Sequence, residues 1–261
     1  GRTTLNGEGL QHEDGHSHVL SSVIPNCVSY DPTYAHELAV IIHDGLKRMI
    51  EHQENVFYYI TVMNENYAQP GLRAGDEEGI LRGGYKLRAG KERAKQRVQL
   101  MGSGTILREV VAAAELLESD WKVAGDVWSI TSFTELRRDG LDCERANMLH
   151  PEDEPKVPYV TQMFDKTSGP LVASTDYMRL FAEQIRAYIP SGRTYKVLGT
   201  DGFGRSDTRA KLREFFEIGR HFVVIAALKA LADDGEIPQS RVAEAIAKYG
   251  INPNKPNPQH A

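Results

Sequence analysis

The second half of the sequence alternates short apolar runs with amphipathic segments, and this alternation limits the fold more than any other feature. The apolar runs have the length and β-branched content of strands: RVQLM, DVWSITSF, PYVTQMF, PLVAS and YKVLG. Segments with helical spacing lie between or after them, at about 105–117, 132 onward, 176–188, 211–216, 222–232 and 240–249. Strands connected in this way pair in parallel beneath helices on both faces. The sequence therefore predicts an α/β fold with a mostly parallel sheet flanked by helices.

Two helix starts can be read from their capping residues. Ser132, followed three residues later by Glu135, predicts a capping box. Ser206 or Asp207 is expected to cap the helix near 211–216.

The first 62 residues form a separate pattern. Asp31 and Pro32 are expected to begin a helix, whose inward stripe would be Ala35, Leu38, Ala39, Ile42 and Leu46. The run VFYYITV at 56–62 predicts a buried parallel strand. Residues 64–79 then lose periodicity and gather Asn, Pro, Gly and charge, which predicts a domain boundary.

Composition excludes several classes of protein. The net charge of −5 provides no basic field for nucleic acid, so no nucleic-acid partner is expected. No apolar stretch reaches the roughly 20 residues that span a bilayer, so no membrane association is expected. The two cysteines, Cys27 and Cys143, form no CxxC motif, which favours a reducing cytoplasm. Since the opening GRTTLNGEGL resembles no leader, we expect the sequence to begin inside a longer protein.

Three short motifs have both a functional and a structural interpretation. The turn MGSGT could offer backbone N–H groups to a phosphate, but tight strand-to-helix packing is the preferred explanation. TDGFGRSDTR, with Arg205 and Arg209, could bind an anion or form a structured turn before a helix. Cys143 is expected to be a buried structural thiol.

The run HEDGHSH contains three histidines, His12, His16 and His18, and leaves three alternatives open. His12 and His16 have the i, i+4 spacing of a helical zinc or nickel ligand pair, but Gly15 argues against a helix there. The run could be a polar surface loop. It could also be an active-site loop whose imidazoles donate hydrogen bonds to oxygen charge on a substrate.

Several long runs carry a resemblance to a known family: GRTTLNGEGLQHEDGHSH, IPNCVSYDPTYAHELAVIIHDGL, STDYMRLFAEQIR and LGTDGFGRSDTR. They closely resemble the homodimeric, bacterial type of pyruvate dehydrogenase decarboxylase component, over essentially the whole sequence. The resemblance implies that residues 1–72 end a middle thiamine-diphosphate domain and that residues 73–261 form a carboxy-terminal transketolase-like domain. It also implies an oxidoreductase of the pyruvate dehydrogenase complex, with thiamine diphosphate and Mg²⁺ as cofactors bound mostly by residues outside this sequence.

The same resemblance gives the histidine-rich loop a role. The thiamine carbanion attacks the keto carbon of pyruvate, and the acetyl group passes to the lipoyl domain of dihydrolipoamide acetyltransferase. The family's catalytic Glu and His fall on Glu8 and His12, with His12 as donor or acid to the reacting oxygen and Glu8 ordering the pocket or relaying a proton. Two alternatives stay open: a dimerisation or assembly module, and another thiamine enzyme such as transketolase or a different 2-oxo acid dehydrogenase.

Overall fold

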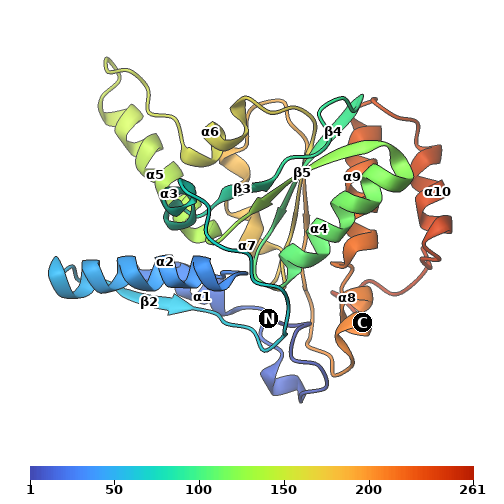
Figure 1. Ribbon diagram of the computed structural model, residues 1–261, viewed down its shortest axis with the longest axis horizontal. Helices are drawn as coiled ribbons and strands as arrows, with labels where there is room; N and C mark the ends of the chain where they lie inside the picture. Colours follow the sequence, from blue (N-terminus) through green and yellow to red (C-terminus); the bar gives the residue numbers. More distant parts are fainter.

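A five-stranded sheet in the order β3–β5–β4–β6–β7 forms the centre of the computed structural model, which describes residues 1–261 (Figure 1). The strands of the molecule are β1 (Cys27–Tyr30), β2 (Phe57–Ile60), β3 (Tyr85–Arg88), β4 (Gln96–Gly102), β5 (Val123–Ser129), β6 (Leu171–Ser174) and β7 (Tyr195–Leu198). Strands β5, β4, β6 and β7 run in parallel, and the edge strand β3 is antiparallel to β5. The predicted α/β fold with a mostly parallel sheet is confirmed.

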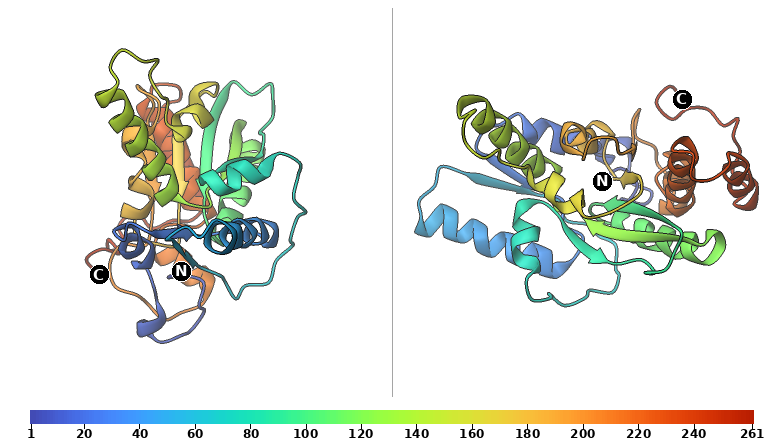
Figure 2. Two further views of the ribbon diagram at one scale, coloured as in Figure 1. Left: turned by 90° about the vertical axis from the view of Figure 1, so that its left-hand side faces the viewer. Right: turned by 90° about the horizontal axis from the view of Figure 1, so that it is seen from above.

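Helices cover both faces of this sheet, as Figure 2 shows from two further directions. The helices are α1 (Ser17–Ser22), α2 (Ala35–Leu46), α3 (Asp76–Arg82), α4 (Ile106–Leu116), α5 (Phe133–Leu149), α6 (Tyr159–Asp165), α7 (Leu180–Glu183), α8 (Arg209–Phe215), α9 (Arg220–Asp233) and α10 (Ser240–Lys248). Short 3₁₀ or π turns occur at η1 (Leu10–His12), η2 (Lys47–Glu51), η3 (Leu117–Trp121) and η4 (Arg186–Tyr188). None of these helices combines the length and apolar character needed to cross a bilayer.

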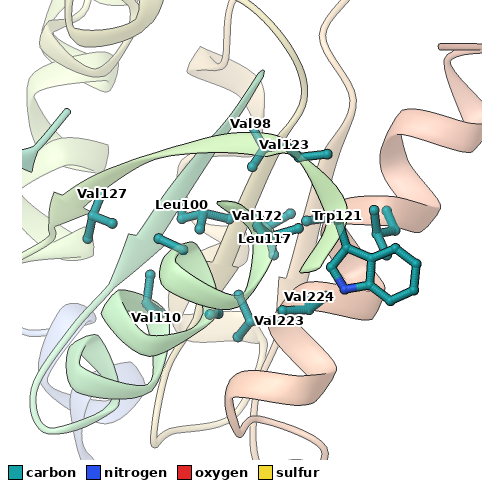
Figure 3. Close-up of a cluster of buried hydrophobic side chains, with 14 of the residues drawn as sticks. Val98, Leu100, Val110, Leu117, Trp121, Val123, Val127, Val172, Val223 and Val224 are labelled. Atoms are coloured by element: carbon teal, nitrogen blue, oxygen red, sulfur yellow. The ribbon is translucent and has the colours of Figure 1, made fainter. Parts of the chain in front are cut away.

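The two faces of the sheet build two cores. Val98 and Leu100 of β4 point to one face, where they pack against α4 and α9 (Figure 3). Met101, one residue on, points to the opposite face and packs in a second cluster with Phe133 of α5 and Phe164 of α6. Because side chains alternate along a strand that is buried on both faces, β4 contributes apolar side chains to both cores.

Residues 17–62 form a separate layer, in which β1 and β2 make a two-stranded parallel sheet beside α2 (Figure 1). The parallel pairing of β2 agrees with the prediction, but Phe57 is exposed and the rest of β2 is only half-buried. The predicted inward stripe of α2 was wrong. The helix buries Glu37, Ile41 and Gly45, which lie on a different face.

The predicted stripe residues of α2 therefore face outward or lie at the margin of the buried face. Ala35, Ala39, Ile42 and Leu46 are exposed, and Leu38 is half-buried. The buried side chain of Glu37 decides the orientation, because its carboxylate accepts hydrogen bonds from Tyr85 of β3 and Ser129 of β5. Successive side chains of a helix are rotated by about 100°, so the face that buries Glu37 cannot also bury the predicted apolar stripe.

Two further predicted elements differ from the structure. PYVTQMF is helix α6 rather than a strand, because Val160 and Phe164, four residues apart, reach the same core. The single helix expected over 176–188 is broken into α7 and the 3₁₀ turn η4. Leu180, expected among its apolar positions, is exposed.

The helix caps confirm one prediction and correct two. The Ser132 hydroxyl accepts from the Glu135 N–H as expected, although the Glu135 carboxylate pairs with Arg138 instead of closing the capping box. Helix α8 is capped by Thr208, not by Ser206 or Asp207. Asp31 does not cap α2 and Pro32 does not begin it, because the helix starts at Ala35 with Tyr34 as its N-cap. The Asp31 carboxylate is instead fully buried and accepts a hydrogen bond from Thr61.

Candidate active-site loop

The loop of residues 5–16 begins at a buried anchor formed by the segment GRTT. The carboxylate of Asp176, which directly follows β6 and Thr175, accepts from the Thr3 N–H (2.9 Å), the Thr3 hydroxyl (2.6 Å) and the Thr4 hydroxyl (2.6 Å). The Thr4 hydroxyl also contacts the hydroxyl of Thr105 at the start of α4. Asp176 and both threonines are buried, so the first residues of the chain are fixed at the carboxyl ends of β4 and β6.

Glu8 and His12 lie beyond this anchor on the exposed part of the loop. His12 ends the 3₁₀ turn η1, in which its N–H donates to the carbonyl of Gly9. Both side chains are exposed, and neither has a hydrogen-bond partner in the structure. The proposed pair therefore lies on the same exposed loop with its polar atoms free to meet a substrate, and its catalytic role stays a prediction.

The loop packs against the motif TDGFGRSDTR, residues 200–209. The structure therefore brings together two motifs that lie about 190 residues apart in the sequence. The Gly7 N–H donates to the carbonyl of Asp207, and Arg209 donates to the carbonyl of Thr4. Gly204 is required by close approach, since a Cβ at that position would lie 2.5 Å from the Cβ of Glu13.

The two arginines of the motif, considered above as anion ligands, make structural contacts. Arg205 donates to the carbonyl of Ala261 and lies over the ring of Phe215. Arg209 lies 3.7 Å from the Glu65 carboxylate. The structured-turn interpretation of the motif is the one that the contacts support.

Glu13, next to His12, is buried and neither of its carboxylate oxygens has a partner. Burial raises the pKa of Glu13 to about 7, and the nearby Asp176 carboxylate adds to the effect. Sequence analysis assigned this residue no role. A carboxyl group that titrates near neutral pH therefore lies directly behind the exposed turn.

The three histidines are not brought together, so the zinc or nickel interpretation finds no support. No group of three or more His, Cys, Asp or Glu side chains is arranged to hold a metal ion. His16 contacts the guanidinium of Arg2. His18 is fully buried, stacked on Phe181 with ring centroids 4.7 Å apart.

His18 also belongs to a buried polar chain between the two layers that sequence reasoning missed. Its Nε2 contacts the Thr61 hydroxyl (2.9 Å), and this hydroxyl donates to Asp31 (2.7 Å). Burial lowers the pKa of His18 to about 3 and raises that of Asp31 to about 6. His18 is therefore neutral and serves as an aromatic core residue with one polar contact. The only sequence signal was the histidine itself.

The remaining motifs are structural. A Cβ at Gly102 would lie 2.7 Å from the Cα of Leu107, which confirms tight packing of β4 on α4. Gly104 has φ +50°, and a Cβ there would lie 2.7 Å from the Asp31 carboxylate oxygens. Cys143 is a buried free thiol, as expected, and Cys27 is also buried and free.

The parallel sheet, its helix-covered faces and the loop held at the carboxyl ends of its strands define a class of α/β domain. The family model "Transketolase-like TK C-terminal domain" matches residues 83–219, and "Pyruvate dehydrogenase E1 component middle domain" matches residues 1–70. The chain belongs to the transketolase-like family described by this C-terminal domain.

Individual relatives and solved structures agree with this assignment. The sequence is 65% identical to the pyruvate dehydrogenase E1 component of Pseudomonas aeruginosa over 99% of this chain, and 61% identical to that of Escherichia coli over 100%. It spans only 29% of the length of each. A transketolase from Leishmania mexicana has a similar fold, with a TM-score of 0.62 and 18% identity over 90% of this chain and 30% of its own.

Proposed function

We propose that these residues form the carboxy-terminal part of a pyruvate dehydrogenase that decarboxylates pyruvate and transfers the acetyl group to the lipoyl domain of dihydrolipoamide acetyltransferase. The identity of 61–65% to relatives named pyruvate dehydrogenase E1 component carries the proposal. Thiamine diphosphate, Mg²⁺, a homodimeric enzyme and a cytoplasmic location belong to it. We also propose the domain division at residue 72, which the separate β1–β2 and five-stranded sheets support.

We propose that the cofactor is bound mostly by residues outside this sequence, as the family resemblance implies. No group of three or more His, Cys, Asp or Glu side chains here is arranged to hold a metal ion. This part of the enzyme would contribute side chains to a site shared with other residues.

Within that site, His12 would donate a hydrogen bond to the keto oxygen of pyruvate as negative charge develops there. A donor of this kind accelerates the reaction only if it binds the charged oxygen better than the neutral carbonyl. Glu8, four residues earlier on the same exposed loop, would order the pocket or relay a proton. The free polar atoms of both side chains support these roles.

We also propose that residues 17–62 pack against a second subunit or further polypeptide. Several of their large apolar side chains are exposed: Leu20 of α1 is 66% exposed, Val23 just after α1 is 75% exposed, and Ile50 of η2 is 67% exposed. Ile42, Leu46 and Phe57 are also exposed. A partner that covered these side chains would remove their apolar surface from water. Assembly is therefore a second candidate function of the same residues.

Steady-state kinetics of the full-length enzyme that contains this sequence test the proposal. His12→Ala should lower kcat for pyruvate-dependent ferricyanide reduction by about 100- to 1,000-fold, the usual effect of losing one oxyanion donor. His150→Ala, at an exposed position after α5, is the matched control and should keep full activity. An unchanged kcat in His12→Ala contradicts the assigned role.

Two further measurements separate the alternatives. The 261-residue chain alone should give no turnover with thiamine diphosphate and Mg²⁺, and turnover would show that the cofactor site is complete. Oxidation of other 2-oxo acids at a rate equal to that of pyruvate would favour a different 2-oxo acid dehydrogenase, and ketol transfer between sugar phosphates would favour a transketolase.

A further inference from the structure

Arg2 is a buried arginine close to the catalytic turn, and neither its burial nor its partners have a part in the roles assigned above. The residue is 2% exposed, and its guanidinium reaches four acceptors on two distant parts of the chain. An arginine with no carboxylate in direct contact is an unusual core residue, because burying a charge requires full hydrogen bonding.

Two of the four acceptors belong to the histidine-rich loop. Nε donates to the carbonyl of Glu13 (3.3 Å), and Nη2 donates to Nδ1 of His16 (3.2 Å). Because a guanidinium only donates, His16 must accept through an unprotonated Nδ1, which fixes its tautomer with the proton on Nε2. The guanidinium therefore holds the loop on the carboxyl side of His12.

The other two acceptors belong to the carboxy-terminal domain. Nη1 donates to the carbonyls of Thr200 and Gly202 in the turn that follows β7. The terminal tail packs closely against this turn: a Cβ at Gly202 would lie 2.3 Å from the carbonyl oxygen of Pro258. The ring of Phe216 lies 5.8 Å from the guanidinium carbon.

Gly15 completes this arrangement. A Cβ at Gly15 would lie 2.5 Å from the guanidinium carbon of Arg2, so the loop can close around the guanidinium only with glycine at this position. The carbonyl of Gly15 also accepts from the Met178 N–H (2.9 Å). Glycine is required at position 15 because the Arg2 side chain packs against its Cα, not because the turn needs an unusual backbone conformation.

We propose that Arg2 is the positioning residue of the catalytic loop: its guanidinium fastens the backbone behind His12 to the Thr200–Gly202 turn and so sets where the imidazole meets the substrate. The inference rests on the proposed role of His12. Burial lowers the pKa of Arg2, while the nearby Asp14 and Asp201 carboxylates oppose that shift. Lysine cannot replace the guanidinium fully, since its three donors cannot serve four acceptors.

The test uses the full-length enzyme with Arg2→Ala and two readouts. Hydrogen exchange of the peptide covering residues 5–16 should accelerate at least 10-fold, and kcat should fall at least 10-fold with KM for pyruvate changed less than 3-fold, as expected for a group that acts only in the transition state. Millimolar guanidinium should restore part of both values by filling the vacated space. Methylammonium and sodium chloride at equal concentration should not.

The possible outcomes distinguish the positioning role of Arg2 from the proposed catalytic role of His12. A fall in kcat with unchanged loop exchange, or with no rescue by guanidinium, overturns the positioning role. Faster loop exchange with an unchanged kcat retains the anchor but overturns the catalytic assignment of the loop. If Arg2→Ala does not fold, Gly15→Ala displaces the guanidinium in a chain that keeps the arginine and should reproduce the accelerated exchange. Normal exchange in that variant contradicts the proposal.

Discussion

Asp176→Ala is expected to be the most destabilising single substitution at the anchor of the loop. The carboxylate is fully buried and accepts three hydrogen bonds from Thr3 and Thr4. After its removal the Thr4 hydroxyl keeps its contact with Thr105, whereas the N–H and hydroxyl of Thr3 lose their acceptor. Each buried donor left without a partner costs about 1–3 kcal/mol, so the free energy of unfolding should fall by about 2–6 kcal/mol.

Asp176→Asn is expected to cost less than half as much. Its amide oxygen can replace the carboxylate oxygen that accepts from both donors of Thr3, and its amide group can donate to the Thr4 hydroxyl. The remaining cost is the difference between charge-assisted and neutral hydrogen bonds, about 1 kcal/mol for each bond. The asparagine no longer buries a charge, and this offsets part of that cost.

Urea unfolding of the 261-residue chain, followed by the fluorescence of Trp121 and Trp128, measures these differences. With an m-value of about 2–3 kcal/mol/M, the alanine variant should unfold at a midpoint roughly 0.7–3 M lower. Asp165→Ala, at the exposed end of α6, is the matched control and should stay close to the parent. An alanine midpoint equal to that of the parent, or an asparagine variant as unstable as the alanine variant, would refute the reasoning.

Three further predictions concern pH and capping. Burial raises the pKa of Glu13 from 4.5 to about 7, so stability should fall as pH rises through that window; Glu13→Gln should match the parent at pH 4 and exceed it at pH 8 in urea midpoint, with exposed Glu8→Gln unchanged. Burial lowers the pKa of His18 from 6.5 to about 3, so His18→Phe should lose less stability than the parent below pH 6.5, and equal acid sensitivity would contradict the buried neutral imidazole. Ser132→Ala removes the acceptor for Glu135 and the donor to the Ser29 carbonyl, which should lower the free energy of unfolding by about 1–3 kcal/mol in thermal or urea unfolding, whereas Ser132→Thr should retain most of it.

Strands β4, β5, β6 and β7 could be predicted from their own sequences, whereas the edge strand β3 was not predicted. Strand β4 and helix α4 are found where periodicity placed them, since β4 is buried over most of its length and α4 buries one apolar face while Glu115 stays exposed. Helix α6 was misassigned because seven residues contain only two turns of helical spacing, Val160 and Phe164. In so short a segment, the β-branched and aromatic residues favoured a strand more strongly than the spacing of two apolar residues favoured a helix.

The orientation of α2 and the seat of the loop could not be predicted, because both depend on buried polar groups whose partners are far away in sequence. Glu37 and Asp176 are acidic residues, which usually lie at the surface, and nothing near them in the sequence marks them as buried. The motifs HEDGHSH and TDGFGRSDTR were each noticed, but periodicity along one chain does not report that they meet. The proposed catalytic residues themselves, Glu8 and His12, were found by resemblance alone.

These buried polar groups have a consequence for how the loop can work. An apolar contact between two layers tolerates small shifts, because its free energy depends on buried area and little on direction. A buried carboxylate such as Glu37, which accepts from the Thr33 N–H, Tyr85 and Ser129, holds only one arrangement, since any shift leaves a donor unpaired at a cost of about 1–3 kcal/mol. Asp176 applies the same constraint to the first residues of the loop. A hydrogen-bond donor such as His12 must be held in place before the reaction if it is to stabilise developing charge. The polar contacts between the layers therefore supply the rigidity that the exposed turn, with no partners of its own, does not have.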